Sequence, residues 1–213
     1  MKRVSFLERA VLGFSAHTGW AASVVVSGPL SAPRVVDRRR IRLAESDDTV
    51  QAEAYHRAAV MKPAAAERFV LEAARSATAK AAEALRALCE GLSGSYALVG
   101  AGIVAGGGKL PMDLEAILRS HALIHAAEGE LYRGALSAAA GSCGLEVIRA
   151  PRREIPERLA SSLEVDVSAV RDSVNEMGRI AGPPWARDQK EAAMTALLAL
   201  AAVWGPGDRD AHL

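Results

Sequence analysis

Two apolar runs near the N-terminus constrain the fold most, because only the three residues His17, Thr18 and Gly19 separate them. Residues 11–16 (VLGFSA) and 20–27 (WAASVVVS) combine small and β-branched side chains, a composition typical of buried strands. Strands that are joined by so short a turn pair with each other in an antiparallel sense. The sequence therefore predicts an antiparallel hairpin.

The segments that follow the hairpin alternate between strand and helix patterns. Residues 34–43 mix charges with valine and isoleucine, which favours an edge strand. Arg38, Arg39 and Arg40 would discourage edge-to-edge pairing there, or alternatively would contact phosphate. Strands connected through helices run parallel, so we expect a mixed five-stranded sheet with helices on both faces. Beyond the edge strand, we predict an irregular segment over residues 45–62, helices over 63–90, 114–141, 166–180 and 185–203, and strands over 96–103 and 146–150.

The composition limits the core and the classes of function. Half of the 213 residues are hydrophobic but only 4% are aromatic, so Ala, Leu and Val must build the core. The 26 Lys and Arg nearly balance the 25 Asp and Glu. The net charge of +1 gives no global nucleic-acid signature, and it leaves a local basic patch open.

Domain organisation and location follow from length, cysteines and hydropathy. We expect one domain over residues 1–205, with residues 157–205 as a packed helical extension and 206–213 as a loose tail. Cys89 and Cys143 have no CxxC partner, which favours reduced thiols. No apolar run approaches the ~18 residues of a membrane span, and we expect no signal peptide. These features predict a cytoplasmic protein without membrane contact.

Common nucleotide-binding and hydrolase motifs are not fulfilled. Residues 99–105 (VGAGIVA) match the GxGxxA pattern of a dinucleotide-binding turn. However, no helix pattern begins directly after them, and no strand ending in an acid follows about 20 residues later. The phosphate-loop pattern around Lys109 lacks its first glycine and its Ser or Thr, and no GxSxG sequence occurs. The sequence thus identifies no cofactor.

The predicted helix over residues 114–141 carries the most prominent site candidates. His121, His125 and Glu128 interrupt its apolar pattern at i, i+4 and i+7, which stacks them along one side. Two imidazoles and a carboxylate suit a borderline metal such as zinc. Three interpretations stay open: metal ligands, a polar site without metal, or structural histidines at a helix boundary.

Two further segments offer candidate site residues. His17 and Thr18 follow the first strand, and the ends of strands are where open α/β folds place ligands. In the sequence GPPWARDQK, Asp188 is most simply a first-turn acid favoured by the helix dipole. Trp185 and Lys190 could face a substrate.

Three segments resemble RuvC-type Holliday junction resolvases, which have a ribonuclease H-like fold. VLGFSAHTGWAASVVVSG resembles the first hairpin of that family, and RDQKEAAMTALLALA resembles the helix leading to its last acidic residues. ELYRGALSAAAGSCGLEVIRAPRREI resembles the central helix, strand and following loop, with Arg133 and Gly134 in matching places. The resemblance implies a ribonuclease H-like α/β domain and makes Arg133 a binding candidate.

The resemblance also implies which carboxylates are missing. The family holds two divalent cations with a carboxylate cluster for phosphodiester hydrolysis. Ser15 stands at the first-strand position of that cluster, where a hydroxyl group could still bind a ligand. Residues 100–102 (GAG) stand where a strand should end in Glu. Asp208 and Asp210 in the tail are the acids in a comparable place.

We therefore expect a degenerate resolvase-like protein, a pseudoenzyme that binds nucleic acid or a nucleotide and that could form a homodimer. One alternative is an enzyme with a rebuilt site in which the His17 turn meets the face of His121, His125 and Glu128. Another is a structural or oligomerisation subunit. The segments HTGWAA, SHALIHAAEGELYR and GPPWARDQK also resemble uncharacterised bacterial proteins, a resemblance that implies no activity.

Overall fold

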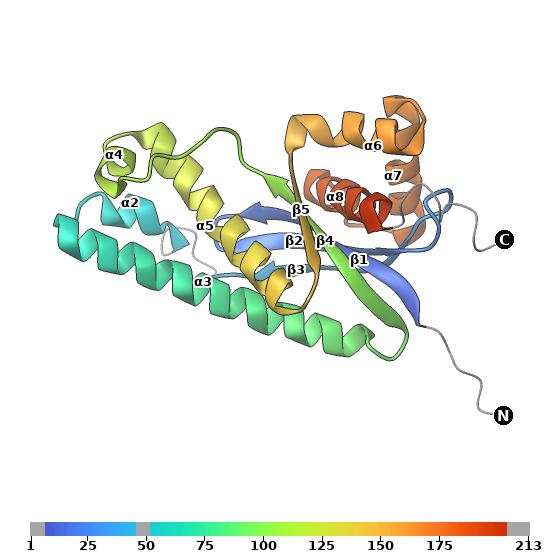
Figure 1. Cartoon of the computed structure of the whole chain (residues 1–213), viewed down its shortest axis with the longest axis horizontal. Coiled ribbons are helices and arrows are strands. Elements are labelled where there is room, and N and C mark those ends of the chain that lie inside the picture. The colour runs from blue at the N-terminus through green and yellow to red at the C-terminus, as the bar shows by residue number, and fades with distance from the viewer. Residues whose placement is uncertain (1–6, 46–51, 204–213) are drawn as a thin grey trace.

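The computed structural model describes residues 7–45 and 52–203. Its centre is one five-stranded sheet with strand order β3-β2-β1-β4-β5 (Figure 1). β1 pairs antiparallel with β2, β2 antiparallel with β3, and β1 and β5 parallel with β4. The predicted mixed sheet with β3 at its edge is confirmed. The strands are β1 (Glu8–His17), β2 (Trp20–Ser27), β3 (Arg34–Arg42), β4 (Tyr96–Ala105) and β5 (Glu146–Pro151).

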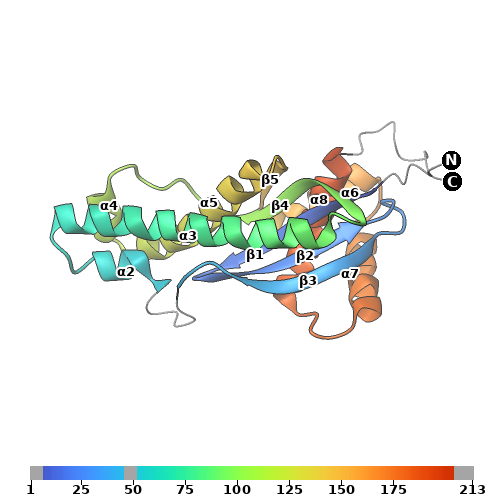
Figure 2. The ribbon, with the colours of Figure 1, turned by 90° about the horizontal axis from the view of Figure 1, so that it is seen from below.

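Helices cover both faces of the sheet, as predicted. On one face lie α3 (Pro63–Leu92) and α5 (His121–Ser142), and on the other lies α8 (Arg187–Val203), with α6 (Ile155–Leu163) and α7 (Val167–Ala181) packed against it (Figure 2). Successive residues of a strand point to opposite faces, so β1 contributes to both cores. Leu12 and Phe14 pack towards α3 and α5, and Val11 packs towards α8.

Two glycines allow α8 to lie directly on the backbone of the sheet. A Cβ atom on Gly13 of β1 would lie 1.8 Å from the carbonyl oxygen of Ala192, and one on Gly102 of β4 would lie 2.0 Å from that of Thr195. Any larger residue would therefore overlap the helix backbone. The GAG sequence of β4 thus has a packing function that its likeness to a dinucleotide-binding turn concealed.

The expected helix over residues 114–141 is wrong in one respect, because the chain breaks it at Arg119 and Ser120. Leu114–Leu118 form the short helix α4, and α5 begins at His121. Ser120 caps α5 by accepting a hydrogen bond from the Leu123 N–H at 3.4 Å, and Asp113 caps α4 in the same way. The Ser120 cap satisfies a backbone donor that a continuous helix would have used internally.

Two further segments differ from the expectation. Within the predicted irregular region, Ala54–Ala58 form the helix α2. After β5, a single 3₁₀ turn at Arg152–Glu154 leads into α6, in addition to the expected α7 and α8. No helix in the described part of the chain is long and apolar enough to cross a membrane. The tail acids Asp208 and Asp210 lie outside the described residues.

Candidate functional site

The carboxyl ends of β1, β4 and β5 meet at one edge of the sheet and border a hollow of about 620 Å³. We call it the strand-end hollow. Its walls include the glycine-rich residues 106–108 and the side chains of Arg133, Arg152 and Arg153. Ends of parallel strands are where open α/β folds place their ligands. The lining of this hollow contains three arginines and no acidic residue.

Beside the hollow, Ser15 of β1 contacts a buried glutamate that the sequence analysis missed. Ser15 Oγ donates a hydrogen bond of 3.0 Å to Oε2 of Glu191 in α8. The other oxygen, Oε1, lies 2.8 Å from Nε of Arg152 and 2.8 Å from Nε of Arg187. The Glu191 side chain is 6% exposed, so it is a buried carboxylate whose one negative charge faces two guanidinium groups.

α8 brings Glu191 to the end of β1 beside the predicted candidate Asp188. The tail acids Asp208 and Asp210, which the resemblance pointed to, lie outside the described residues. The spacing of Arg187 and Glu191 is that of an ordinary surface ion pair on a helix, which conceals the burial of the carboxylate. A sequence signal did exist, since Glu191 stands next to the apolar run AAMTALLALA.

His17 lies at the same edge and on the α8 side of the sheet. The His17 ring stacks on the Trp20 ring, with centroids 4.2 Å apart. The guanidinium carbon Cζ of Arg40 lies over the Trp20 ring, 4.1 Å from its centroid. His17 Nε2 lies 3.1 Å from Oδ1 of Asp188, close enough for an ion pair although the angles do not suit a hydrogen bond. Asp188 is thus a first-turn acid, as predicted, with a specific partner.

The other candidates of this region are placed differently. Trp185 donates from Nε1 to the carbonyl of Val174 at 3.0 Å, and its ring packs on Gly178, where a Cβ atom would lie 2.0 Å from the ring. This indole therefore fastens the loop before α8 to α7. Thr18 is half-buried in the turn after β1, and Lys190 is half-buried on α8.

The arginines of the edge strand β3 have partners in the protein. Arg38 donates to the carbonyl oxygens of Pro183 at 2.7 Å and Pro184 at 2.9 Å. Arg39 forms a bidentate pair with Asp37. With Arg40 over Trp20, all three side chains are engaged. This arrangement does not favour the phosphate-contacting strip.

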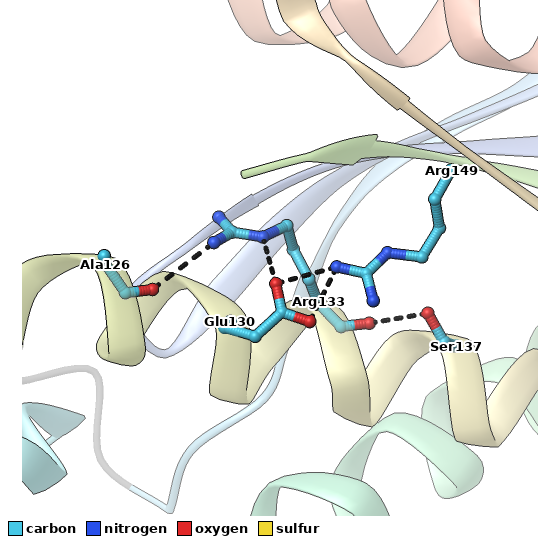
Figure 3. A network of polar contacts seen from close by, with 5 residues as sticks. All are labelled: Ala126, Glu130, Arg133, Ser137 and Arg149. Atoms are coloured by element: carbon cyan, nitrogen blue, oxygen red, sulfur yellow. Dashed lines mark hydrogen bonds and ion pairs between the residues drawn. The ribbon is translucent and has the colours of Figure 1, made fainter. Parts of the chain in front are cut away.

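The side chain of Arg133 in α5 lines both the strand-end hollow and a smaller hollow of about 410 Å³. Its Nε lies 3.2 Å from Glu130, which also binds Arg149 of β5 at 2.7 Å (Figure 3). A Cβ atom on Gly106 would lie 2.4 Å from the Arg133 guanidinium, so a larger residue there would displace the end of this side chain. Burial lowers the pKa of Arg133, and its ion pair with Glu130 opposes that effect.

His121 and His125 meet a third histidine that the sequence analysis did not single out, His56 of α2. Their rings lie edge to face, with centroids 4.3 Å apart for His121 and His125 and 4.7 Å apart for His56 and His125. Glu128 lies beneath them and is 2% exposed. Burial raises the pKa of Glu128, and hydrogen bonds from His56 and Tyr55 lower it in part.

The structure does not bring His17 together with this group. His17 pairs with α8 on one side of the sheet, whereas His121, His125 and Glu128 belong to α5 on the other. The proximity required for a rebuilt site that uses all four residues is therefore absent. His56 could not have been added from sequence, because 65 positions separate it from His121 and only the packing of α2 on α5 joins them.

Comparisons with known proteins identify the fold. The chain matches no family model, and no curated protein is detectably similar to it in sequence. Among solved structures it is similar to Thermus thermophilus RuvC in complex with a Holliday junction substrate, at 14% identity and a TM-score of 0.54, over 94% of this chain and 97% of that one. A second T. thermophilus RuvC structure aligns at 14% identity and a TM-score of 0.50, over 91% and 95%. This chain therefore has a RuvC-like, ribonuclease H-like fold.

Proposed function

We propose that the protein binds nucleic acid through the strand-end hollow and does not hydrolyse it by two-metal chemistry. The observation that carries this proposal is that protein donors bind both oxygens of the buried Glu191 carboxylate. Its carboxylate is bound by Ser15, Arg152 and Arg187, so its oxygens are engaged by protein donors and its one negative charge faces two positive charges.

The donor set at this edge does not suit a pair of hard cations. Magnesium is bound through oxygen ligands, of which the protein usually supplies one or two carboxylates that are free to coordinate it. Over residues 7–45 and 52–203, the one group of three His, Cys, Asp or Glu side chains with metal-ligand spacing is formed by histidines elsewhere. Ser15 supplies a hydroxyl group where an anionic ligand would be needed.

The lining of the hollow suits an anion. Arg133, Arg152 and Arg153 border it, and the side chain of Arg153 is 88% exposed. Guanidinium groups bind phosphate oxygens in a bidentate manner, and such contacts dominate the affinity of proteins for nucleic acids. The solved RuvC neighbour is in complex with a Holliday junction, which makes branched DNA the first ligand to test.

Fluorescence anisotropy with a labelled four-way junction, a duplex and a single strand, in EDTA, tests the proposal. We expect binding to the junction at low salt that weakens as salt increases. Arg153→Glu should raise the Kd about tenfold and reduce the salt slope by about 1. Arg86→Glu is the matched control, because it makes the same change of charge at an exposed arginine of α3 on the other side of the sheet. Competition with mononucleotides distinguishes the nucleotide alternative.

Absence of binding to every nucleic acid at low salt would refute the proposal. Equal losses for the Arg153 and Arg86 variants would also count against it, because the contact would then be non-specific. In parallel samples without EDTA, an excess of magnesium or manganese should produce no cleavage. Homodimer formation and a cytoplasmic location stay predictions, and sedimentation of the free protein would decide the first.

A further inference from the structure

Three histidines gather at the end of the molecule where α2 and the start of α5 extend beyond the sheet (Figure 1). We call His56, His121 and His125 the histidine cluster. Each contributes one ring nitrogen to a group whose members all lie within 4.8 Å of one another. His121 and His125 are exposed and His56 is half-buried. The cluster is therefore open to solvent on one side.

Local structure explains how the cluster forms. Ser120 caps α5 so that the helix begins at His121, and a spacing of four residues stacks His125 on the next turn. His56 belongs to α2, and the N-cap residue of that helix, Glu53, makes no capping hydrogen bond with its side chain. Instead, Oε1 of Glu128 accepts hydrogen bonds from the backbone N–H groups of Tyr55 at 2.6 Å and His56 at 3.2 Å. A carboxylate of α5 thus holds α2, and with it His56, against the other two rings.

The same carboxylate orients the His56 ring. Oε1 of Glu128 lies 3.4 Å from His56 Nδ1, which directs Nε2 of that ring away from Glu128. Histidines that bind metals commonly donate their second ring nitrogen to a carboxylate, which fixes the tautomer. Helix capping employs only one of the two oxygens. Oε2 of Glu128 is buried and has no hydrogen-bond partner among the described residues, a costly arrangement for a purely structural group.

We propose that the histidine cluster binds one divalent transition-metal ion of the zinc class, with Glu128 as the carboxylate that positions His56. Three imidazole ligands suit zinc, with bonds of about 2.0–2.1 Å, and leave a fourth tetrahedral position for water or a ligand. Such bonds place the three nitrogens about 3.3 Å apart. The three nitrogens lie within 4.8 Å of one another without the ion, so the rings must move closer together when it binds.

This site is separate from the strand-end hollow, so it neither requires nor excludes nucleic-acid binding. Arg133, which borders the hollow, follows His125 by eight residues on α5, or about 12 Å along the helix axis. The proposal also differs from the sequence prediction. Glu128 changes from a metal ligand to a positioning residue, and His56 takes its place.

Zinc binding by untagged protein is the direct test. After equilibrium dialysis against micromolar zinc, elemental analysis should find one ion per chain, and cobalt should give the visible absorption bands of a tetrahedral complex. The double variant His121→Ala, His125→Ala should bind zinc at least 100-fold more weakly. Glu128→Gln should weaken binding about 10- to 100-fold and leave the stoichiometry at one.

The control carries His17→Ala together with His212→Ala, so that the cluster contains the only histidines left. It should bind zinc like the parent protein. Because His121 and His125 are exposed, their replacement is not expected to unfold the chain, and circular dichroism checks this. The proposal is overturned if the parent protein takes up less than half an ion per chain, or if the double variant and the parent protein bind zinc equally.

Discussion

The two sides of the sheet each bury a glutamate, and the protein satisfies them in opposite ways. Glu191, on the α8 side, contacts two arginines and the Ser15 hydroxyl, so both oxygens have partners and its one negative charge faces two positive charges. Glu128, on the α5 side, accepts hydrogen bonds through one oxygen, from two backbone N–H groups and one imidazole. Its second oxygen has no hydrogen-bond partner in the described part of the chain.

The difference between the two carboxylates indicates which of them could take part in binding a cation. A carboxylate whose oxygens are bound by two guanidinium groups and a hydroxyl group has little capacity left to bind a cation. A carboxylate that is held by neutral donors keeps its charge available to a neighbouring imidazole. Both oxygens of Glu191 are therefore engaged within the protein, whereas Glu128 contacts one of three histidines that have metal-ligand spacing.

We expect the largest loss of stability from a substitution that prevents the close approach of α8 to β1. Gly13→Ala would place a Cβ atom 1.8 Å from the Ala192 carbonyl, so α8 must move away from β1. We expect a loss of at least about 4 kcal/mol in the free energy of unfolding, or no folded protein at all. Urea denaturation followed by circular dichroism measures it.

Gly134→Ala is the matched control for this substitution. Gly134 is helical, and a Cβ atom there would meet nothing within 4 Å. Alanine should stabilise the helix by about 0.5–1 kcal/mol relative to glycine. If Gly13→Ala were as well tolerated as the control, the direct contact between α8 and the sheet would be refuted.

Removal of the Glu191 carboxylate should have the next largest effect. Glu191→Ala leaves the Ser15 hydroxyl buried without an acceptor and leaves two arginines facing each other, for a loss of about 3 kcal/mol. The partial exposure of both arginines keeps the cost at the lower end for a broken buried pair. Thermal unfolding of the variant gives the value, and Ser15→Ala should cost less than half as much.

High pH should weaken the α5 side through Tyr132, which lies one turn from Glu128. Burial, with a smaller contribution from the Glu128 charge, raises the pKa of Tyr132 from 10.0 to about 12. The folded state therefore retains the proton more strongly than the unfolded state does. This contribution to stability is complete below pH 10 and is lost as pH rises to 12. Across that window the loss should be at most about 2.7 kcal/mol.

The comparison with Tyr132→Phe isolates this effect. The Tyr132 hydroxyl donates to the carbonyl of Ala52 at 2.7 Å, so the variant loses one hydrogen bond at every pH. Its stability should nevertheless fall less steeply than that of the parent protein between pH 10 and pH 12. Parallel slopes in urea titrations at pH 10, 11 and 12 would exclude a role for the buried phenol.

The smallest predicted effect concerns the rate at which Cys89 of α3, on the α5 side of the sheet, is alkylated. Burial, with the neighbouring Cys143 thiol, raises the pKa of Cys89 from 9.0 to about 11. Because the thiolate is the reactive form, Cys89 should be alkylated by iodoacetamide at pH 8 about 100-fold more slowly than a free cysteine. Mass spectrometry of timed digests gives the rate. Alkylation at the free rate in the folded protein would contradict the raised pKa.

Much of the fold was predictable, because the signals that define it are local. The hairpin over residues 11–27 was predicted from apolar and β-branched residues on both sides of a short turn, and the structure confirms the hairpin. The turn is shorter than predicted, because His17 belongs to β1 and pairs with Trp20. The division into α4 and α5 was missed although Ser120 is a good N-cap residue, since the apolar spacing continues across the break. Short caps of this kind are hard to separate from helix interiors by periodicity alone.

The candidate site was less predictable, because it depends on contacts between distant segments. His121, His125 and Glu128 were found through their spacing on one helix, which sequence displays directly. His56 was missed because it has no local signal that separates it from a surface residue. Glu191 was missed because its spacing from Arg187 is that of a surface ion pair, although an apolar run follows it directly. The interpretation that His17 lies beside the α5 histidines was wrong, because its side chain lies on the α8 face. A position at the end of a strand predicts at which edge of the sheet a residue lies, but not on which face its side chain lies.

The contact between Ser15 and Glu191 also has a consequence for how the chain folds. It joins residues 176 positions apart, and the apolar face of β1 that it borders is covered by α8, the last helix in the described sequence. Contacts of such long range slow folding, because loop closure must precede them. Until α8 docks, Val11, Val24 and Val104 form an uncovered apolar surface. A chain stalled at this stage would have a nearly complete sheet and would associate with other chains through that surface.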